Sequence, residues 1–492
     1  MPAHPARSAD DLRDLAAALG LPLTAAEADA SLGPVSTILD SLAPLDEALE
    51  DGRDVPAAEP VEAEDPHNAF ITRCEVAPTR SDGPLAGVTV ALKDNIALAG
   101  VPQTAGSAVL EDCVPARNAP VVDRLLDAGA RLVGKTNMDE FAFGPTGETS
   151  AFGPTTNPVD PAYTPGGSSS GSAAAVASGA ADLALGTDTG GSVRIPASYT
   201  GVIGLKPTLG IVPADGVVEL SGSLDTVGLL GTDLDRVAAG YAVLAGEPAA
   251  GAGSADGAES PGGDGPAPVE PGSLTVGLPD ALFDDPVDPA VADHVRAVVD
   301  ELGAAGASVR TVPFPGTAAT SAAWRAIAMS ELYCYLRDAA RPYRRAEATS
   351  WAVERCLAEA GPAALKRLSA PLKRYLLVGA ALVTTDGGRT YGRARNVQPW
   401  LARQVDAAFE SVDVLATPTT PTTAYRFGAF SRDTSPPINR NTHPFNLTGH
   451  PALSLPAGEL DDLPVGLQLV TPHGTEAFLL RVARTVLDVV AD

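Results

Sequence analysis

The chain has 492 residues, with 34 Lys or Arg against 61 Asp or Glu, so its formal net charge is −27. So acidic a protein is a poor candidate for coating nucleic acid, because each phosphate contact needs a cation. The hydrophobic fraction of 45% and the charged fraction of 19% are typical of a packed globular protein and fit poorly with disorder, collagen or a coiled coil.

The N-terminal part of the chain is predicted to be a helical segment followed by a linker. Apolar residues recur at spacings of three and four between residues 9 and 50, as at Leu12, Leu15 and Leu19, which predicts two or three short helices. The polar stretch DGRDVPAAEPVEAEDP then separates them from the main body. Neither a signal peptide nor an apolar run of about 20 residues is visible, so we expect a cytoplasmic protein.

From Leu85 onward, predicted strands and helices alternate. The strand GVTVAL precedes the amphipathic helix APVVDRLLDAGA, and the strand RLVG precedes SAAAVASGA, a helix of small residues. Such alternation predicts an α/β layered core. Residues 247–273 are acidic and contain few large apolar groups, so we expect a flexible insertion there. The strand LTVGLP follows, then mainly helical sequence to about residue 410, and finally DVLATPTTP and the closing strand PVGLQLV.

Two short motifs match known patterns but lack the context that those patterns need. GARLVGKT, residues 129–136, matches a phosphate-binding loop, yet a helix ends before it and its own residues 131–133 form the strand. We therefore favour a helix, a turn and a strand. GSSSG, residues 167–171, matches a nucleophile elbow centred on Ser169, but a proline-rich loop precedes it instead of a strand. The downstream histidines available to such a serine, none of them marked as a base, are His443, His450 and His473.

A larger pattern combines one lysine with two segments rich in Gly and Ser. Lys93 ends VTVALK, and Ser168 in TPGGSSSGSAAAVASG lies 24 residues before Ser192 in ALGTDTGGSVRIPASYTGVIGLKPT. With GKTNMDEFAFG, AFGPTTNP, SLDTVG, DVLATPTTPTTA and PVGLQL in the same order, this pattern resembles the amidase signature family from about residue 68 to the C-terminus. The departures are Ser170, where that family usually has glycine, and the acidic insertion.

The resemblance implies a fold and a division of the chain. The fold is α/β, with a central mixed β-sheet of about ten strands, helices on both faces of the sheet and an N-terminal helical segment. We expect residues 1–66 to be the helical segment and linker, and residues 67–492 to be the catalytic domain, with residues 247–273 as its flexible insertion.

The resemblance also implies a proton relay of two serines and a lysine. In that scheme Ser192 attacks the amide carbonyl and becomes the acyl-enzyme, Ser168 carries the proton, and neutral Lys93 is the final base. Lys93 ends an apolar strand, where desolvation lowers the pKa of an amine, although a surface lysine at a strand end is the alternative. A cis peptide bond at Ser168 is implied as well, with a flexible Gly/Ser turn as its alternative. Activity should then rise from neutral to alkaline pH.

The GTDTGGS loop is expected to stabilise the charge that develops on the substrate oxygen. The backbone amides that would form this oxyanion hole are those of Thr189, Gly190, Gly191 and Ser192. Asp188 and Arg194 flank the loop and are expected to pair and brace it, with an exposed charge pair as the alternative. Ser169 and Thr189 are expected to supply supporting hydrogen bonds. Neither a metal nor an organic cofactor is required by this chemistry.

Two functions are consistent with the resemblance. The first is an amidase that hydrolyses a carboxylic amide to the acid and ammonia or an amine, with a small-molecule substrate, no nucleic acid, no membrane and a possible homodimer. The alternative is the glutamine-hydrolysing A subunit of a tRNA-dependent amidotransferase, a branch that MDEF and AFGPTTNP resemble. That branch carries a glutamine-binding acid seven residues before the Asn of a Pro-x-Asn-Leu-x-Gly stretch. Here that Asn is Asn446 and the matching residue is Asn439, so we favour the amidase.

Overall fold

The computed structural model describes residues 8–18, 20–41, 57–246, 265–284, 286–338, 351–431 and 434–491. The chain divides into two compact units, Met1–Val55 and Pro56–Asp492. Of the insertion that the sequence predicts at 247–273, the residues up to 264 lie outside the described ones. The predicted boundary between residues 66 and 67 remains a proposal.

The smaller unit contains two described helices, α1 (Ala9–Ala18) and α2 (Ala25–Asp40), which pack against each other. A capping box fixes the start of α2, because the hydroxyl of Thr24 accepts from the Glu27 N–H at 3.3 Å and the Glu27 carboxylate accepts from the Thr24 N–H at 2.8 Å. The third helix that the sequence allowed would fall in residues 42–50, which lie outside the described residues.

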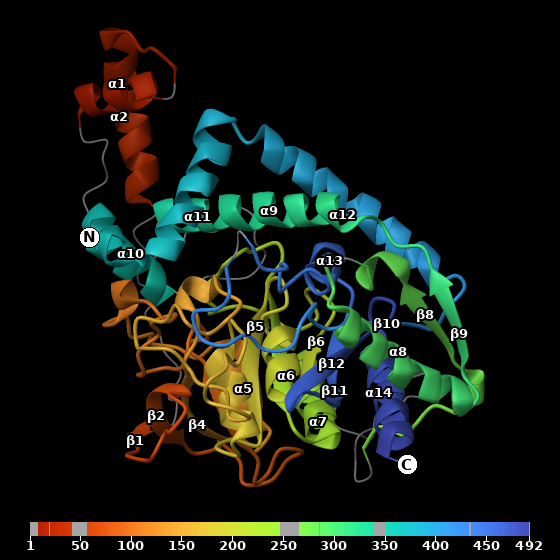
Figure 1. The fold of residues 1–492 in the computed structure, drawn as a ribbon. Coiled ribbons are helices and arrows are strands. Elements are labelled where there is room, and N and C mark those ends of the chain that lie inside the picture. The colour runs from red at the N-terminus through yellow and green to blue at the C-terminus, as the bar shows by residue number, and fades with distance from the viewer. Residues whose placement is uncertain are drawn as a thin grey trace. The chain divides into compact units, whose positions relative to one another are not determined.

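The larger unit is built on one mixed sheet, which has twelve strands in the described chain where about ten were expected (Figure 1). The strands are β1 (Glu59–Pro60), β2 (Phe70–Val76), β3 (Thr89–Lys93), β4 (Arg131–Thr136), β5 (Leu183–Asp188), β6 (Ile203–Lys206), β7 (Thr226–Gly231), β8 (Thr275–Pro279), β9 (Ser308–Val312), β10 (Val414–Pro418), β11 (Ala452–Leu460) and β12 (Leu463–Val470). Their order across the sheet is β1-β2-β4-β3-β5-β7-β6-β11-β12-β10-β8-β9. The strand β3 runs parallel to both β4 and β5, whereas β5 and β6 are antiparallel to β7.

Helices cover both faces of the sheet, as predicted. The α-helices described in the larger unit are α4 (Pro120–Asp127), α5 (Ser170–Ala177), α6 (Arg194–Thr200), α7 (Leu234–Ala245), α8 (Pro289–Ala304), α9 (Thr317–Arg337), α10 (Trp351–Ala364), α11 (Ala370–Ala380), α12 (Arg389–Ala408), α13 (His443–Thr448) and α14 (Glu476–Ala491). Successive side chains of a strand point to opposite faces. Val90 and Leu92 of β3 therefore join a core cluster with α4, α7, α8 and α14, whereas Ala91 between them joins a cluster with α5 and α6.

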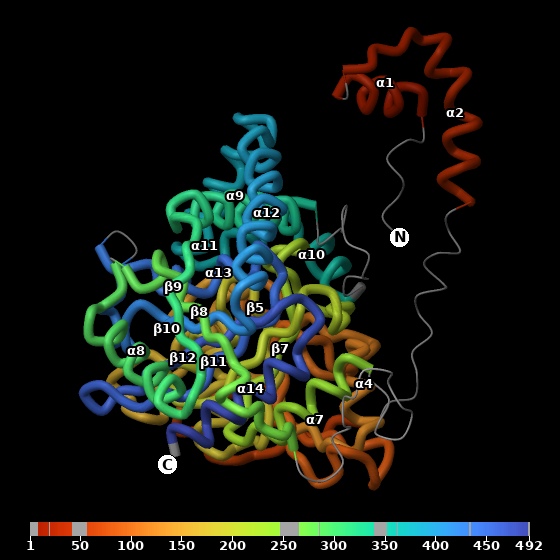
Figure 2. Tube along the Cα trace, turned by 90° about the vertical axis from the view of Figure 1, so that its right-hand side faces the viewer, coloured from red at the N-terminus to blue at the C-terminus, as the bar shows by residue number. Residues whose placement is uncertain are grey.

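A second group of helices lies at one end of the larger unit. The long helix α9 packs against α11, α12 and α13. Figures 1 and 2 both place α9, α11 and α12 at the end of the unit opposite α7 and α14. Among the described residues no helix is both long and apolar enough to cross a membrane.

The sequence predicted the stronger elements but not the whole sheet. The segment Arg131–Thr136 is strand β4 and follows α4 after a short turn, which confirms the helix-turn-strand interpretation of the GKT motif. By contrast, Ser308–Val312 lies in a stretch predicted to be helical, yet it forms β9 and pairs with β8. Most of this edge strand is exposed, so it lacks the alternation of buried and exposed residues that would identify it in the sequence.

Candidate active site

The carboxyl ends of two neighbouring strands bring the predicted site together. Because β3 and β5 are parallel and adjacent, their last residues, Lys93 and Asp188, reach the same edge of the sheet. Two helices begin nearby, since Ser168 lies just before α5 and Ser192 just before α6. Three separate segments of the sequence therefore meet at one place.

Lys93 is fully buried and contacts two hydroxyl groups. Its Nζ lies 2.7 Å from Ser168 Oγ and 2.8 Å from Thr187 Oγ1. Burial lowers the pKa of Lys93 to about 7, although nearby carboxylates oppose the shift. The peptide bond between Gly167 and Ser168 is cis, as the resemblance implies. An amine with this pKa is largely unprotonated at mildly alkaline pH, and so can accept a proton from Ser168.

Thr187 and Asn95 were missed by the sequence reasoning. Asn95 Nδ2 donates to Thr187 Oγ1 at 3.1 Å and to the carbonyl of Val218 at 3.2 Å, so it fixes the hydroxyl that contacts Lys93. Thr187 directly precedes Asp188 on β5, and Asn95 follows Lys93 by two positions. Their positions next to predicted site residues were the only signal in the sequence, and nothing there indicated which way each side chain points.

Ser192 lies on the wall of a cavity of about 650 Å³, together with Gly167, Thr189 and Gly190. Ser192 is 9% exposed, and its carbonyl accepts from the Ser169 N–H at 3.2 Å. Within the described residues no hydrogen bond joins the hydroxyls of Ser168 and Ser192. The structure thus brings Lys93 and Ser168 into direct contact and places Ser192 at the surface that a substrate can reach.

The loop before Ser192 differs from the expected oxyanion hole at one position. The N–H of Gly191 donates to Asp188 Oδ1 at 2.7 Å, so this amide points at a buried carboxylate and away from the cavity. The amides of Thr189, Gly190 and Ser192 have no acceptor among the described residues. A side chain at Gly190 would collide with Trp324, whose Nε1 donates to the carbonyl of Thr189 at 2.8 Å. Gly191 therefore leaves the expected set of donors, and Thr189, Gly190 and Ser192 stay as predictions.

Asp188 and Arg194 form a buried, bidentate ion pair instead of an exposed one. Arg194 Nη2 and Nε donate to the two carboxylate oxygens at 2.9 and 3.0 Å, and neither side chain is exposed. Burial would raise the pKa of Asp188, but the guanidinium of Arg194 holds it well below its usual range. Asn446 on α13 donates to Asp188 Oδ1 at 2.8 Å and accepts from Arg194 Nη2 at 2.7 Å. Through Asn446, the distant helix α13 thus holds both members of the ion pair that flanks the loop.

The two supporting hydroxyls make hydrogen bonds inside the protein. Thr189 Oγ1 donates to Asp225 Oδ1 at 2.5 Å, and Ser169 Oγ donates to the carbonyl of Thr187 at 3.3 Å. No histidine among the described residues contacts Ser169. His443 bonds instead to Asn439 and Ser321, and burial lowers its pKa to about 3. The nucleophile elbow with Ser169 at its centre therefore has no base.

Charged groups of both signs line the same cavity. Two guanidiniums, Arg325 on α9 and Arg374 on α11, lie on its wall with one carboxylate, Glu148. Glu148 Oε1 accepts from the N–H of Gly428 at 2.8 Å, which orients this carboxylate. Asn439, the uncharged residue noted in the sequence, also lines the cavity. The cavity can therefore bind a substrate that carries charges beside its amide.

Comparisons with known proteins relate both the sequence and the fold to amidases and amidotransferase subunits. The sequence profile of the family described as Amidase matches residues 67–480. The A subunit of glutamyl-tRNA(Gln) amidotransferase from Natronomonas pharaonis is 45% identical over 438 residues, which are 84% of this chain and 98% of that protein. Among solved structures, the A subunit of glutamyl-tRNA(Gln) amidotransferase from Thermotoga maritima is 28% identical, with a TM-score of 0.68 over 91% of this chain and 89% of that one. Native peptide amidase from Stenotrophomonas maltophilia is 32% identical, with a TM-score of 0.65 over 82% and 83%.

These relatives overturn one expectation from the sequence. We expected a small-molecule substrate, no nucleic acid and a possible homodimer, and the exclusion of nucleic acid is wrong, because the protein from Natronomonas pharaonis is named for a reaction on tRNA. The error came from treating the net charge of −27 as a property of every surface. A total charge does not say where cations lie, and in an enzyme of several subunits a different chain can contact the phosphates.

Proposed function

The chain belongs to the amidase family, an enzyme family that acts on the carbon–nitrogen bonds of amides, and we propose that it is the glutamine-hydrolysing A subunit of a tRNA-dependent amidotransferase. The observation that carries the proposal is the 45% identity to such a protein over 98% of that relative. A reaction on tRNA would place the protein in the cytoplasm. Ammonia released from glutamine would then be used at a second site, on another subunit.

The proposed chemistry is an acyl transfer that uses Lys93, Ser168 and Ser192. Ser192 Oγ forms a bond to the amide carbon, while its proton passes to Ser168 and the Ser168 proton passes to Lys93. As the carbon–nitrogen bond breaks, Lys93 returns the proton by the same route to the leaving nitrogen, so that neutral ammonia departs. Water then repeats the sequence on the acyl-enzyme and releases the acid. The contact of 2.7 Å between Lys93 Nζ and Ser168 Oγ supports the transfer from Ser168 to Lys93.

The charges of the cavity support glutamine as the substrate. Free glutamine carries an α-carboxylate and an α-ammonium beside its side-chain amide. Arg325 and Arg374 offer partners for the carboxylate, and Glu148 offers a partner for the ammonium, a role that Asn439 cannot fill with the same strength. Glu148 would thus supply the acid that the family resemblance leads one to expect at position 439.

A second candidate is the hydrolysis of simple or peptide amides by this chain alone. The observation that favours it is the neutral side chain of Asn439 on the cavity wall, where the amidotransferase branch has an acid. The similarity to a peptide amidase in both sequence and fold is consistent with it. The chemistry at Ser192 would be the same, so only the substrate separates the two candidates.

The first experiment measures ammonia release by the purified chain from glutamine, from butyramide and from a peptide amide. The same chain is then combined with the other amidotransferase subunits of its cell, glutamyl-tRNA, ATP and glutamine labelled with ¹⁵N in the amide. The proposal predicts release from glutamine and transfer of the label to the tRNA-bound amino acid. Release from the peptide amide with none from glutamine would establish the second candidate instead.

The nucleophile is tested with two serine variants and a matched control. Ser192→Ala should abolish the acyl-enzyme and lower kcat by at least about 10⁴-fold. Ser178→Ala, at the end of α5, removes a hydroxyl that bonds only to helix carbonyls and should leave kcat within about twofold. Loss of the acyl-enzyme in Ser169→Ala but not in Ser192→Ala, detected by mass spectrometry, would restore the elbow mechanism.

The role of Glu148 is tested with a pair of substrates. Glu148→Gln should raise KM for glutamine by about tenfold, because a charge-assisted hydrogen bond to the α-ammonium is lost. Glutaramate, which lacks the amino group of glutamine, is the matched substrate, and its KM should not change. An equal rise in both KM values would mean that Glu148 only shapes the wall of the cavity.

A further inference from the structure

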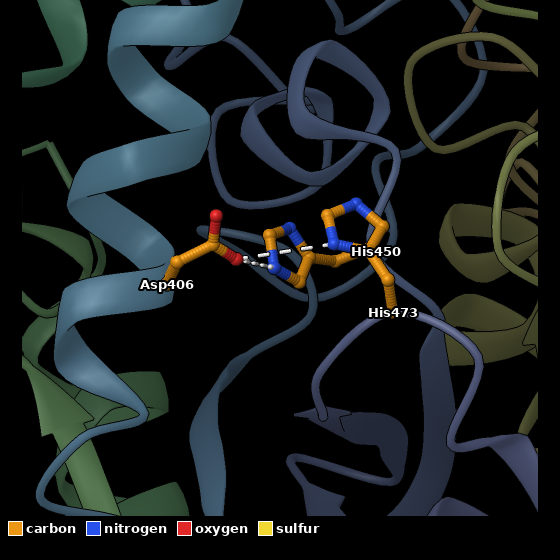
Figure 3. Close-up of side chains that lie close together, drawn as sticks. All are labelled: Asp406, His450 and His473. Atoms are coloured by element: carbon orange, nitrogen blue, oxygen red, sulfur yellow. Dashed lines mark hydrogen bonds and ion pairs between the residues drawn. The ribbon is translucent and has the colours of Figure 1, made fainter.

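Two histidines and one aspartate converge outside the active site. Asp406 lies on α12, His450 follows α13, and His473 lies in the turn after β12. Figure 3 shows the three side chains pointing toward one another, and one nitrogen or oxygen of each lies within 4.8 Å of the others. The imidazole rings overlap at a centroid distance of 3.8 Å. None of the three lines the substrate cavity as the structure describes it.

The hydrogen bonds of His473 fix where its proton lies. His473 Nε2 is 2.8 Å from the carbonyl oxygen of Thr448, which can only accept, so Nε2 carries the proton. In the neutral ring Nδ1 then has a lone pair, and this atom faces Asp406 Oδ1 at 3.9 Å. In that form two electron-rich atoms face each other, and a cation bound between them would stabilise the arrangement.

His450 can direct a second lone pair at the same point. Its Nδ1 lies 2.8 Å from the hydroxyl of Thr448, which can accept a hydrogen bond and so lets Nδ1 hold the proton. Nε2, the other nitrogen, lies 3.0 Å from Asp406 Oδ1. Thr448 thus bonds to the far nitrogen of both rings, as outer hydrogen-bond partners do for histidines that bind metals.

We propose that Asp406, His450 and His473 bind a divalent transition-metal ion of the Zn²⁺ class. In a tetrahedral site with bonds of about 2.0–2.2 Å, neighbouring ligand atoms are about 3.3–3.6 Å apart. The two distances from Asp406 Oδ1, 3.0 and 3.9 Å, lie on either side of that value. The fourth position would face solvent, because the side chains of Asp406 and His473 are 55% and 40% exposed.

The position of the site indicates a structural role. A bound ion would join α12 to the segments that follow α13 and β12. Each ligand lies within three residues of the end of its helix or strand. Helix α13 also carries Asn446, which bonds to both Asp188 and Arg194 beside the catalytic loop. The ion would therefore anchor the end of the helix that braces this loop, and its main effect should be on stability.

The test uses the full chain, freed of metal with a chelator and then titrated with Zn²⁺. We expect one Zn²⁺ per chain by calorimetry and elemental analysis, and a rise in Tm of about 3 °C at a hundredfold excess over Kd. Co²⁺ in place of Zn²⁺ should give the intense visible absorption of a tetrahedral site, which reports the ligands without any substitution.

Substitutions at the two exposed ligands test the site, and a substitution at a nearby carboxylate is the control. Asp406→Asn and His473→Gln should each lower Zn²⁺ affinity by at least about 100-fold, the upper end of the loss seen when only an outer partner of a ligand is removed, and should remove the rise in Tm. Glu410→Gln, an exposed carboxylate four residues beyond Asp406, loses the same charge and should bind as the wild type does. Equal affinity in all three variants would place the ion elsewhere and overturn the proposal. No Zn²⁺ uptake by the wild type, with His473 protonated against Asp406, would identify a simple ion pair instead.

Discussion

The ends of strands β3 and β6 carry the same residue in nearly the same setting, yet only one of them is equipped for chemistry. Lys93 and Lys206 each end their strand, each is fully buried, and burial lowers the pKa of each to about 7. Their partners differ. Lys93 contacts the hydroxyl of Ser168, whereas Lys206 Nζ donates to the carbonyl of Pro207 at 2.7 Å.

The comparison separates two requirements for a lysine base. Burial makes an amine easy to deprotonate, and both lysines meet this requirement. A base also needs a neighbour that can release a proton. The hydroxyl of Ser168 can do so, but the carbonyl beside Lys206 has no proton to give. A lowered pKa alone therefore does not identify a catalytic lysine, and the neighbouring group decides.

The most direct test of the difference between Lys93 and Lys206 is to remove each amine in turn. Lys93→Met should lower kcat for ammonia release by about 10³- to 10⁴-fold, because the serine relay then has no final base. The long apolar side chain fills the space that the lysine stem occupies, so that the fold is retained. Circular dichroism and a cooperative thermal unfolding transition like that of the wild type would show that the variant keeps its fold.

Lys206→Met is the matched control, with the same burial and the same change. Its kcat should stay within about threefold of the wild type, because Lys206 lies in no proposed proton path. A comparable collapse of activity in both variants would show that loss of a buried amine disturbs the site through packing. The assignment of Lys93 as the base would then have no support from mutagenesis.

A smaller effect is expected when the amine stays and its second hydroxyl partner is removed. Thr187→Val keeps the shape of the side chain but removes the oxygen that lies 2.8 Å from Lys93 Nζ. We expect kcat to fall by about tenfold with little change in KM, since the amine loses one of the bonds that orient it. An unchanged kcat would mean that Ser168 and the carbonyl of Thr187, which accepts from Lys93 Nζ at 3.3 Å, are enough to position the amine.

The smallest effect concerns the pH dependence of activity. Deprotonation of Lys93 should make kcat/KM rise with pH through a midpoint near the pKa of about 7. The carboxylate of Asp139 favours the ammonium form and raises this pKa, so Asp139→Asn should move the midpoint to lower pH. Initial rates between about pH 5.5 and 9, in half-unit steps, measure the shift.

Asp112→Asn is the control for the pH series, because this carboxylate is exposed and its charge is screened by solvent. Its midpoint should match that of the wild type. A midpoint that moves to higher pH in Asp139→Asn would contradict the sign of the interaction. It would indicate that the variant mainly changes how deeply Lys93 is buried.

Local motifs identified the central residues of the candidate site because these residues lie in recognisable stretches of sequence. Lys93, Ser168 and Ser192 each lie in a segment whose small or apolar neighbours are part of the pattern, so their identity could be read from the chain. The pairing of Asp188 with Arg194 followed from a separation of only six residues. The α/β class also followed, because alternating strands and helices leave a periodic signal.

The tertiary structure alone decided which distant groups complete the site. Asn446 reaches Asp188 from a helix more than two hundred residues away, and Asp225, just before β7, accepts from the hydroxyl of Thr189. The direction of the Gly191 amide also depended on where the fold places the buried carboxylate of Asp188. Residue types and local spacing specify what a side chain can do, whereas hydrogen bonds between remote segments exist only after the sheet has brought those segments together.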